Sequence, residues 1–270
     1  MWRLSLIRFL LRALGTVAPG AAAWWACRML MRPQRHPRQD WEAAAPSDYD
    51  IHVIEGGLVA RSWGQGPTVL LLHGWSGRHT QFGPLVEALR KSGFKPVTID
   101  PPAHGDSPGT TAHPIGFADA AFAAAEAFAP VAAVVGHSMG AGAVAYSLTL
   151  ENYAPRAVLI AGPASMSRVL GRYADLLQLA NAVRVRLFLR VGRLMGIAEH
   201  ELDIERIAPP PGVRFLVVHD RDDKEVPVGE AEAIARHWTD STLHLTRGLG
   251  HTRLLADPET VQRIVTFIAR

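Results

Sequence analysis

The segment VAAVVGHSMGAGAV, residues 131–144, runs from an apolar stretch through a glycine-flanked serine into small apolar residues. Its first five residues are typical of a buried strand, and the residues from Met139 onward are predicted to form a helix. Ser138 therefore lies in a tight turn between a strand and a helix. Gly136 and Gly140 fit that turn, because side chains two residues before and after the serine would clash there.

Short apolar runs alternate with helical stretches on both sides of this segment. Strands are predicted at 68–72, 95–100, 131–135, 156–161, 214–219 and 242–246, after a hairpin over 51–63, and helices at about 81–92, 116–129, 139–150, 228–238 and 257–268. Strands that alternate with helices form a mainly parallel sheet with helices on both faces. The sequence therefore predicts an α/β fold whose functional residues gather at the carboxyl ends of the strands.

A long insert, residues 162–212, separates two of these strands. Its apolar residues recur at helical spacing from Met166 to Leu177, and a second helix is predicted over 183–196. The apolar stripe fits either plain packing or the wall of an acyl pocket. We expect one domain over 49–270 and, before it, a basic, apolar N-terminal segment and linker over 1–48.

The turn at Ser138 predicts a nucleophile, because free N–H groups at a helix N-terminus favour developing negative charge. A reactive serine needs a base, and the base needs a carboxylate that orients it. Three aspartates follow the strand at 214–219: Asp220, Asp222 and Asp223. We favour Asp223 as the acid, because a tight turn at the Val226-Pro227 step three residues later would aim its carboxylate inward.

The base is predicted to be His251, in a glycine-flanked loop after the last strand, from which an imidazole can reach the serine. Other histidines fit less well, because they lie within or at the ends of regular elements: His219, His237 and His244.

An oxyanion needs two N–H donors. Directly after the strand at 68–72 stands His73-Gly74-Trp75, and Gly74 allows the bend that would point the Trp75 N–H into the site. The second donor is predicted to be the N–H of Met139, the residue after the serine.

Together these motifs resemble the α/β-hydrolase superfamily, in its single-domain esterase- and lipase-like branch. The resemblance covers residues 50–270 and rests on HGW (73–75), DPPAHGDS (100–107), GHSMG (136–140), HDRDDKEVP (219–227) and GLGH (248–251). It implies that residues 162–212 form a helical cap over the active site. It also implies the roles given above for Ser138, Asp223, His251, Trp75 and Met139.

The chain departs from the family pattern at two places. Pro102-Ala103 stands where a glycine is common before the His-Gly pair, and Asp220 stands where glycine is common. Neither change removes a catalytic group, but Asp220 adds charge beside the expected acid.

The N-terminal segment carries the basic balance of the chain. The net charge is +3 and residues 1–38 hold seven arginines and no acid, so the remainder carries −4. We therefore expect no nucleic-acid partner. The longest uncharged run, Ala13 to Cys27, has fifteen residues and is interrupted by Pro19-Gly20, whereas a spanning helix needs roughly 20.

Three roles remain open for residues 1–38. They are packing or self-association, peripheral membrane association, and a signal or anchor. Because all expected catalytic residues follow residue 72, we expect a chain that starts near Asp48 still to fold and to hydrolyse a small soluble ester. We expect a cytoplasmic protein that is either free or bound to a membrane through this segment.

The sequence predicts a serine hydrolase that cleaves a carboxylic ester or a related acyl bond of a small-molecule substrate. No metal or organic cofactor is expected, because neither metal-site spacing nor a phosphate-binding glycine loop is present. Acyl transfer, or cleavage of a thioester, amide or carbon–carbon bond, would use the same residues. A non-catalytic binding protein on this fold is the alternative of another class.

Overall fold

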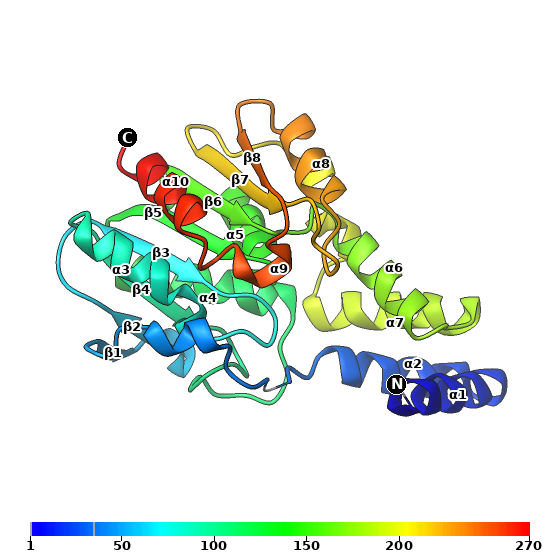
Figure 1. Ribbon diagram of the computed structural model, residues 1–270. Coiled ribbons are helices and arrows are strands. Elements are labelled where there is room, and N and C mark those ends of the chain that lie inside the picture. Colours follow the sequence, from blue (N-terminus) through cyan, green and yellow to red (C-terminus); the bar gives the residue numbers. More distant parts are fainter. Residues whose placement is uncertain (1, 35) are drawn as a thin grey trace.

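The protein is built around one eight-stranded sheet (Figure 1). The computed structural model describes residues 2–34 and 36–270. In chain order the strands are β1 (Asp50–Val53), β2 (Val59–Ser62), β3 (Thr68–Leu72), β4 (Lys95–Asp100), β5 (Val131–His137), β6 (Arg156–Ile160), β7 (Arg214–Asp220) and β8 (Thr242–Thr246). Their order across the sheet is β1-β2-β4-β3-β5-β6-β7-β8. β2 runs antiparallel to both β1 and β4, and the six strands from β4 to β8 run parallel to one another.

Helices cover both faces of the sheet. One face packs against α3 (Gly83–Lys91) and α10 (Pro258–Ile268), and the other against α4 (Pro114–Ala127), α5 (Met139–Leu150) and α8 (Gly229–His237). The central parallel strands are buried on both sides, which explains why their sequences are continuous apolar runs, such as TVLLL in β3. The predicted fold class is confirmed.

The cap consists of α6 (Met166–Leu176) and α7 (Asn181–Met195), followed by short helices η4 (Glu199–Leu202) and η5 (Ile204–Arg206). Ser165 begins α6 as its N-cap, accepting a hydrogen bond from the Arg168 N–H, and Gly196 ends α7 in the left-handed conformation.

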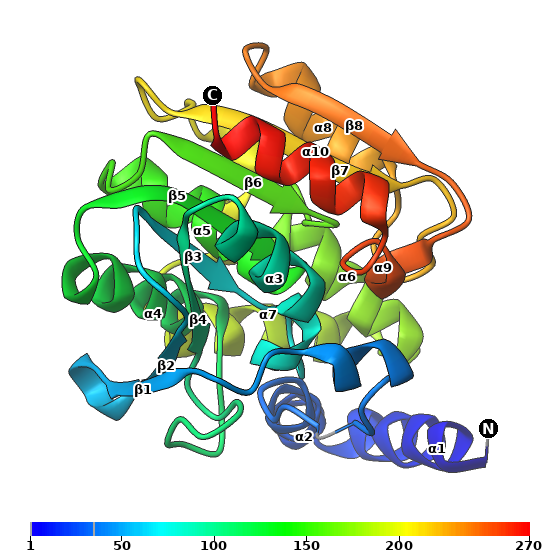
Figure 2. The ribbon, with the colours of Figure 1, turned by 60° about the vertical axis from the view of Figure 1, so that its left-hand side comes forward.

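The first residues of the chain form a helical hairpin, α1 (Trp2–Val17) and α2 (Pro19–Leu30), joined at Ala18. Its helices pack on the cap helix α7, on the side away from the sheet, as both views show (Figures 1 and 2). Small side chains allow close contact: Ala22, Ala23 and Ala26 are fully buried with Val183 and Leu187. This hairpin, the cap and their shared apolar side chains form a third core beside the two around the sheet.

Residues 36–48, part of the region expected to be a linker, lie along the domain. The short helix η1 (Asp40–Ala44) buries Glu42, which accepts a hydrogen bond of 2.6 Å from Thr80 Oγ1. Two other short helices, η2 (Glu55–Gly57) and η3 (His79–Phe82), complete the fold with α9 (Gly250–Arg253). In residues 2–34 and 36–270, no helix is long and apolar enough to cross a membrane.

Candidate active site

Ser138 lies between β5 and α5 in a backbone conformation that serine rarely adopts, with φ 53° and ψ −119°. Its N–H donates to Ile160 O at 2.8 Å, which ties the turn to β6. The flanking glycines are sterically required. A Cβ on Gly136 would lie 2.6 Å from Ala141 Cα, and one on Gly140 would lie 2.6 Å from His73 O. The turn therefore raises the serine at the N-terminus of α5, as the sequence predicts.

Asp223 and His251 form a direct pair at the ends of β7 and β8. His251 Nδ1 donates to Asp223 Oδ2 at 2.7 Å, while Asp223 Oδ1 accepts from the N–H groups of Glu225 (2.8 Å) and Val226 (2.9 Å). Burial would raise the pKa of Asp223, but hydrogen bonds from His219 and His251 outweigh it and hold the pKa well below its usual range. The aspartate is thus ionised, and the other ring nitrogen, His251 Nε2, lies 3.9 Å from Glu225 Oε2.

The other two aspartates, Asp220 and Asp222, bind backbone N–H groups and the Thr246 hydroxyl instead of a histidine. Asp220 Oδ2 accepts from Thr246 Oγ1 (2.7 Å) and the Leu249 N–H (3.0 Å). Asp222 Oδ2 accepts from the Gly248 N–H at 3.0 Å. Both side chains therefore fasten the end of β7 and the loop after it to the segment just before α9. His251 lies in this short helix and not in the open loop that the sequence predicts.

The peptide between Gly74 and Trp75 lies against Ser138, since a Cβ on Gly74 would stand 2.7 Å from Ser138 Cβ. The Gly74 carbonyl accepts from His73 Nδ1 (2.8 Å) and from the Gly77 N–H (3.0 Å). A trans peptide points its carbonyl and its N–H in opposite directions. The Trp75 N–H therefore points away from His73 and Gly77. Met139 is the first residue of α5, where N–H groups have no acceptor within the helix.

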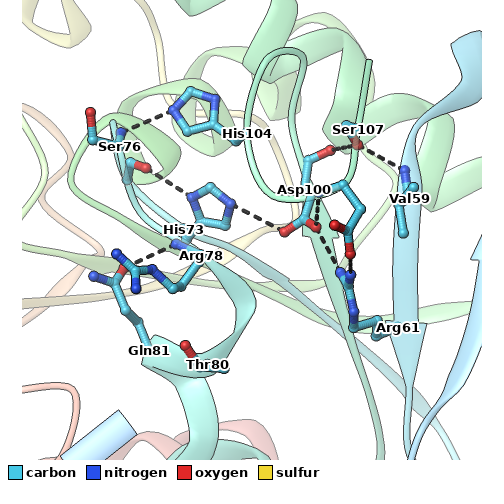
Figure 3. Close-up of polar contacts among 12 residues, drawn as sticks. Val59, Arg61, His73, Ser76, Arg78, Thr80, Gln81, Asp100, His104 and Ser107 are labelled. Atoms are coloured by element: carbon cyan, nitrogen blue, oxygen red, sulfur yellow. Dashed lines mark hydrogen bonds and ion pairs between the residues drawn. The ribbon is translucent and has the colours of Figure 1, made fainter. Parts of the chain in front are cut away.

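A buried polar network holds this loop in place (Figure 3). His104 Nδ1 donates to Pro102 O and His104 Nε2 accepts from the Ser76 N–H, both at 2.9 Å. Burial lowers the pKa of His104 to about 4, so the ring is neutral and can accept that bond. The Pro102-Ala103 departure from the family pattern therefore leaves a loop that still anchors Ser76.

Asp100, at the end of β4, is the second anchor of the network (Figure 3). It pairs with the buried guanidinium of Arg61 at 2.7 Å and lies 3.6 Å from His73 Nε2. Burial opposes ionisation, but the nearby His73 ring and the charge and hydrogen bond of Arg61 prevail and keep the pKa of Asp100 well below normal. A charged Asp100 thus holds the strand ends on which the expected oxyanion loop rests.

Two buried histidines touch the site and were not assigned a role from the sequence. His137 Nε2 donates to His251 O at 2.9 Å, and its burial lowers its pKa to about 3. His219 Nε2 donates to Val226 O at 2.9 Å and lies 3.4 Å from Asp223 Oδ2. His137 holds the backbone of the expected base, and His219 holds the turn of the expected acid. For His137, its position next to Ser138 in the sequence was a signal that could have indicated a role at the site.

A cavity of about 440 Å³ opens at these residues. Ser138, His251, Trp75 and Met139 all line it, so the structure brings the four together with Asp223 behind His251. Most of the remaining wall is apolar and comes from α6, α7 and the end of α2: Leu30, Met31, Met166, Leu170, Tyr173 and Val191. No hydrogen bond joins Ser138 Oγ to His251 in the described chain, a contact that often closes only when substrate binds.

Arg78 and His79, close to the expected oxyanion loop, point elsewhere. Arg78 donates to His36 O and lies 3.8 Å from Glu42 Oε2, while the His79 ring packs on Tyr49. Neither lines the cavity at Ser138. Among residues 2–34 and 36–270, no group of three or more His, Cys, Asp or Glu side chains could hold a metal ion.

Comparisons with known proteins agree on the fold. A sequence model described as "Alpha/beta hydrolase family" matches residues 69–263. The esterase Pf2001 of Pyrococcus furiosus is 19% identical, with 88% of this chain and 98% of that chain covered and a TM-score of 0.65. Rv0554 of Mycobacterium tuberculosis is 20% identical, with 82% and 98% covered and a TM-score of 0.60.

A third similar structure is Est1E of Butyrivibrio proteoclasticus with bound ferulic acid, at 18% identity, 79% and 97% coverage and a TM-score of 0.60. A search of curated proteins found no significant match. At these identities the solved structures carry the fold alone.

Proposed function

Because the chain belongs to the alpha/beta hydrolase family, we propose that it is a serine hydrolase that cleaves a carboxylic ester through an acyl-enzyme. The observation that best supports this proposal is the 2.7 Å hydrogen bond between His251 Nδ1 and Asp223 Oδ2, beside a cavity that both His251 and Ser138 line. Such a pair is what a serine needs to become a nucleophile at neutral pH.

In this mechanism Ser138 Oγ attacks the ester carbonyl and gives its proton to His251 Nε2. The resulting oxyanion accepts hydrogen bonds from the N–H groups of Trp75 and Met139. When the tetrahedral intermediate collapses, the protonated His251 returns the proton to the leaving alkoxide. Water then attacks the acyl-enzyme, with His251 again taking and returning a proton, and the carboxylic acid leaves. Asp223 keeps Nδ1 protonated and offsets the imidazolium charge.

The cavity supports an apolar acyl chain as the substrate group bound beside the serine. Its wall beyond the catalytic residues is mainly aliphatic, from Leu30 and Met31 of the N-terminal hairpin to Met166, Leu170 and Val191 of the cap. Burying methylene groups there stabilises bound substrate by about 0.8 kcal/mol each. We therefore propose that esters of longer acyl chains have higher kcat/KM than acetate esters.

A fluorophosphonate probe tests the proposal, because it reacts only with an activated serine. The wild-type protein should be labelled on Ser138, as peptide mass spectrometry would show, and should hydrolyse nitrophenyl esters. Ser138→Ala should abolish labelling, and His251→Ala should lower kcat by roughly 10³-fold or more. A folded wild-type protein that is neither labelled nor active would point to a binding protein and overturn the proposal.

A further inference from the structure

The outer surface of the N-terminal hairpin is apolar where a water-facing helix would be polar. On α1, the side chains of Trp2, Leu6, Phe9, Leu10 and Val17 are exposed, with Trp2 at 70% and Phe9 at 67%. Their spacing places them on one side of the helix. The opposite side, which includes Leu11 and Gly15, packs on α2 and the cap helix α7. α1 therefore carries two apolar faces, of which only one is covered.

Most of the exposed large apolar side chains of the described residues lie on the hairpin and the cap helices. Beyond the hairpin and the cap helices, only Ile51, Val53 and Leu150 are comparably exposed large apolar side chains in the described part of the chain. On α2, Trp24 and Trp25 are also exposed. Tryptophan combines an apolar ring with an N–H donor and favours the boundary between membrane and water.

Arginines border the exposed face of α1. At 100° per residue, Arg3 lies along one border and Arg12 beyond the other, whereas Arg8 lies on the covered side and donates to Leu176 O at 2.7 Å. Arg3 stacks over the Trp2 ring, and Arg28 over the Trp24 ring, at 5.6 and 5.4 Å from the ring centres. In the ranges 2–34 and 36–270, none of these arginines forms an ion pair with a carboxylate. The segment 1–38 contains no acid at all.

We infer that the exposed face of α1, with Trp24 and Trp25 of α2, docks on the surface of an anionic lipid bilayer. An apolar helix face bordered by arginines suits the plane between headgroups and acyl chains, where the side chains enter the lipid and the guanidinium groups meet phosphates. A hairpin with helices of 16 and 12 residues is too short to span the bilayer, so it would lie along the surface. The positive charge without nearby acids favours lipid over a second copy of the same basic surface.

Cosedimentation of the full chain with vesicles tests this docking and needs no catalytic activity, so it is independent of the proposed function. One set of vesicles holds phosphatidylcholine alone, and the other also holds phosphatidylglycerol. The wild-type protein should bind the anionic vesicles, more weakly at high salt. The triple variant Leu6→Ser, Phe9→Ser, Leu10→Ser should lower the partition constant by about tenfold or more. Arg3→Gln with Arg12→Gln should weaken binding to anionic vesicles only.

The matched control is Ile51→Ser with Val53→Ser, which removes exposed apolar side chains from the edge strand β1 and should leave binding unchanged. Circular dichroism and thermal unfolding verify that each variant is folded. Docking is ruled out if the wild-type protein ignores anionic vesicles or if the triple variant binds as well as the wild type. If the wild-type protein is a dimer that does not bind vesicles, and the triple variant is a monomer, then the exposed face of α1 binds a second copy of the chain instead.

Discussion

Ser138 holds a left-handed backbone conformation that costs on the order of 1–3 kcal/mol for a residue other than glycine. The surrounding contacts offset that cost: its N–H bonds Ile160 O, and its carbonyl accepts from the N–H groups of Ala141 and Gly142. The strain aims the hydroxyl at the cavity and away from the packed strands. The backbone strain at Ser138 thus lowers stability locally and presents to the cavity a side chain that could otherwise be buried.

Gly140→Ala tests how tightly the serine turn is packed. A Cβ there would lie 2.6 Å from His73 O and closer still to Leu72 O, both of them backbone atoms that cannot move freely. We expect the free energy of unfolding in urea to fall by about 2 kcal/mol or more. Gly142→Ala is the control in the same helix, because its Cβ would meet Pro163 at an ordinary 3.5 Å, and it should be neutral or stabilising. Equal stability of the two variants would contradict the packing described.

Substitution of the three aspartates separates catalysis from loop structure. Asp223→Asn should lower kcat by about 10⁴-fold, because the amide cannot hold His251 in the required tautomer. Asp222→Asn should remain near wild type. Asp220→Asn places an amide N–H₂ against the donors Thr246 and Leu249, and should cost about 1–3 kcal/mol of stability with a smaller loss of kcat. Steady-state kinetics and urea unfolding of each variant measure both effects.

At the scale of elements, the cavity depends on a helix that is far in sequence from the proposed catalytic residues. The end of α2 is fixed at two points: Met31 O accepts from the Ala112 N–H at 2.9 Å, and Ala26 O accepts from Tyr173 Oη–H at 2.8 Å. Gln34 N–H then donates to Ser76 Oγ at 2.8 Å. The hairpin is therefore tied to the cap and to the loop that carries Trp75.

Leu30→Trp tests whether this hairpin forms part of the acyl pocket. The larger ring would fill space beside Ser138, so kcat/KM for a long-chain ester should fall by about tenfold, while that for the acetate ester stays unchanged. Leu10→Trp, on the exposed side of α1, is the control and should change neither value. A uniform loss for both esters would indicate disturbed folding, and no loss for either would remove Leu30 from the pocket.

Local sequence patterns predicted the structural features that depend on neighbouring residues, and they missed the contacts between residues far apart in the sequence. The strand–turn–helix at Ser138 and the alternation of strands and helices were predicted correctly, because hydrophobic periodicity and glycine spacing depend only on residues close together in the sequence. The packing of α2 on α7 depends instead on residues about 160 positions apart, since Ala22, Ala23 and Ala26 are buried with Val183 and Leu187. The expectation that a chain starting near Asp48 still folds is therefore revised, since removal of α1 and α2 would uncover this core and open the cavity. Likewise, Asp220 and Asp222 gained their roles from partners on another loop.

At the scale of the whole molecule, several histidines are buried in neutral form at or after the carboxyl ends of β3, β4 and β5. Burial is the main cause that lowers the pKa of His79 to about 4, of His104 to about 4 and of His137 to about 3. His104 and His137 stabilise loops through hydrogen bonds that require a neutral ring nitrogen or a fixed tautomer. At mildly acidic pH these histidines therefore bind fewer protons in the folded protein than in the unfolded chain.

Stability should consequently decline as the pH falls from about 6.5 to about 4. An unfolded histidine binds a proton below about 6.5, whereas these folded ones do not until about 4 or lower, so acid favours unfolding by about 1.4 kcal/mol per pH unit for each. Below about 4, protonation of Asp100 and Asp223, whose pKa values are lowered in the folded state, removes further stability. Urea unfolding at a series of pH values measures the slope. His79→Phe should make the slope shallower by one proton, because its ring packs on Tyr49 outside the cavity at Ser138. A free energy of unfolding that stays constant from pH 7 to 4.5 would show that these histidines are protonated in the folded protein.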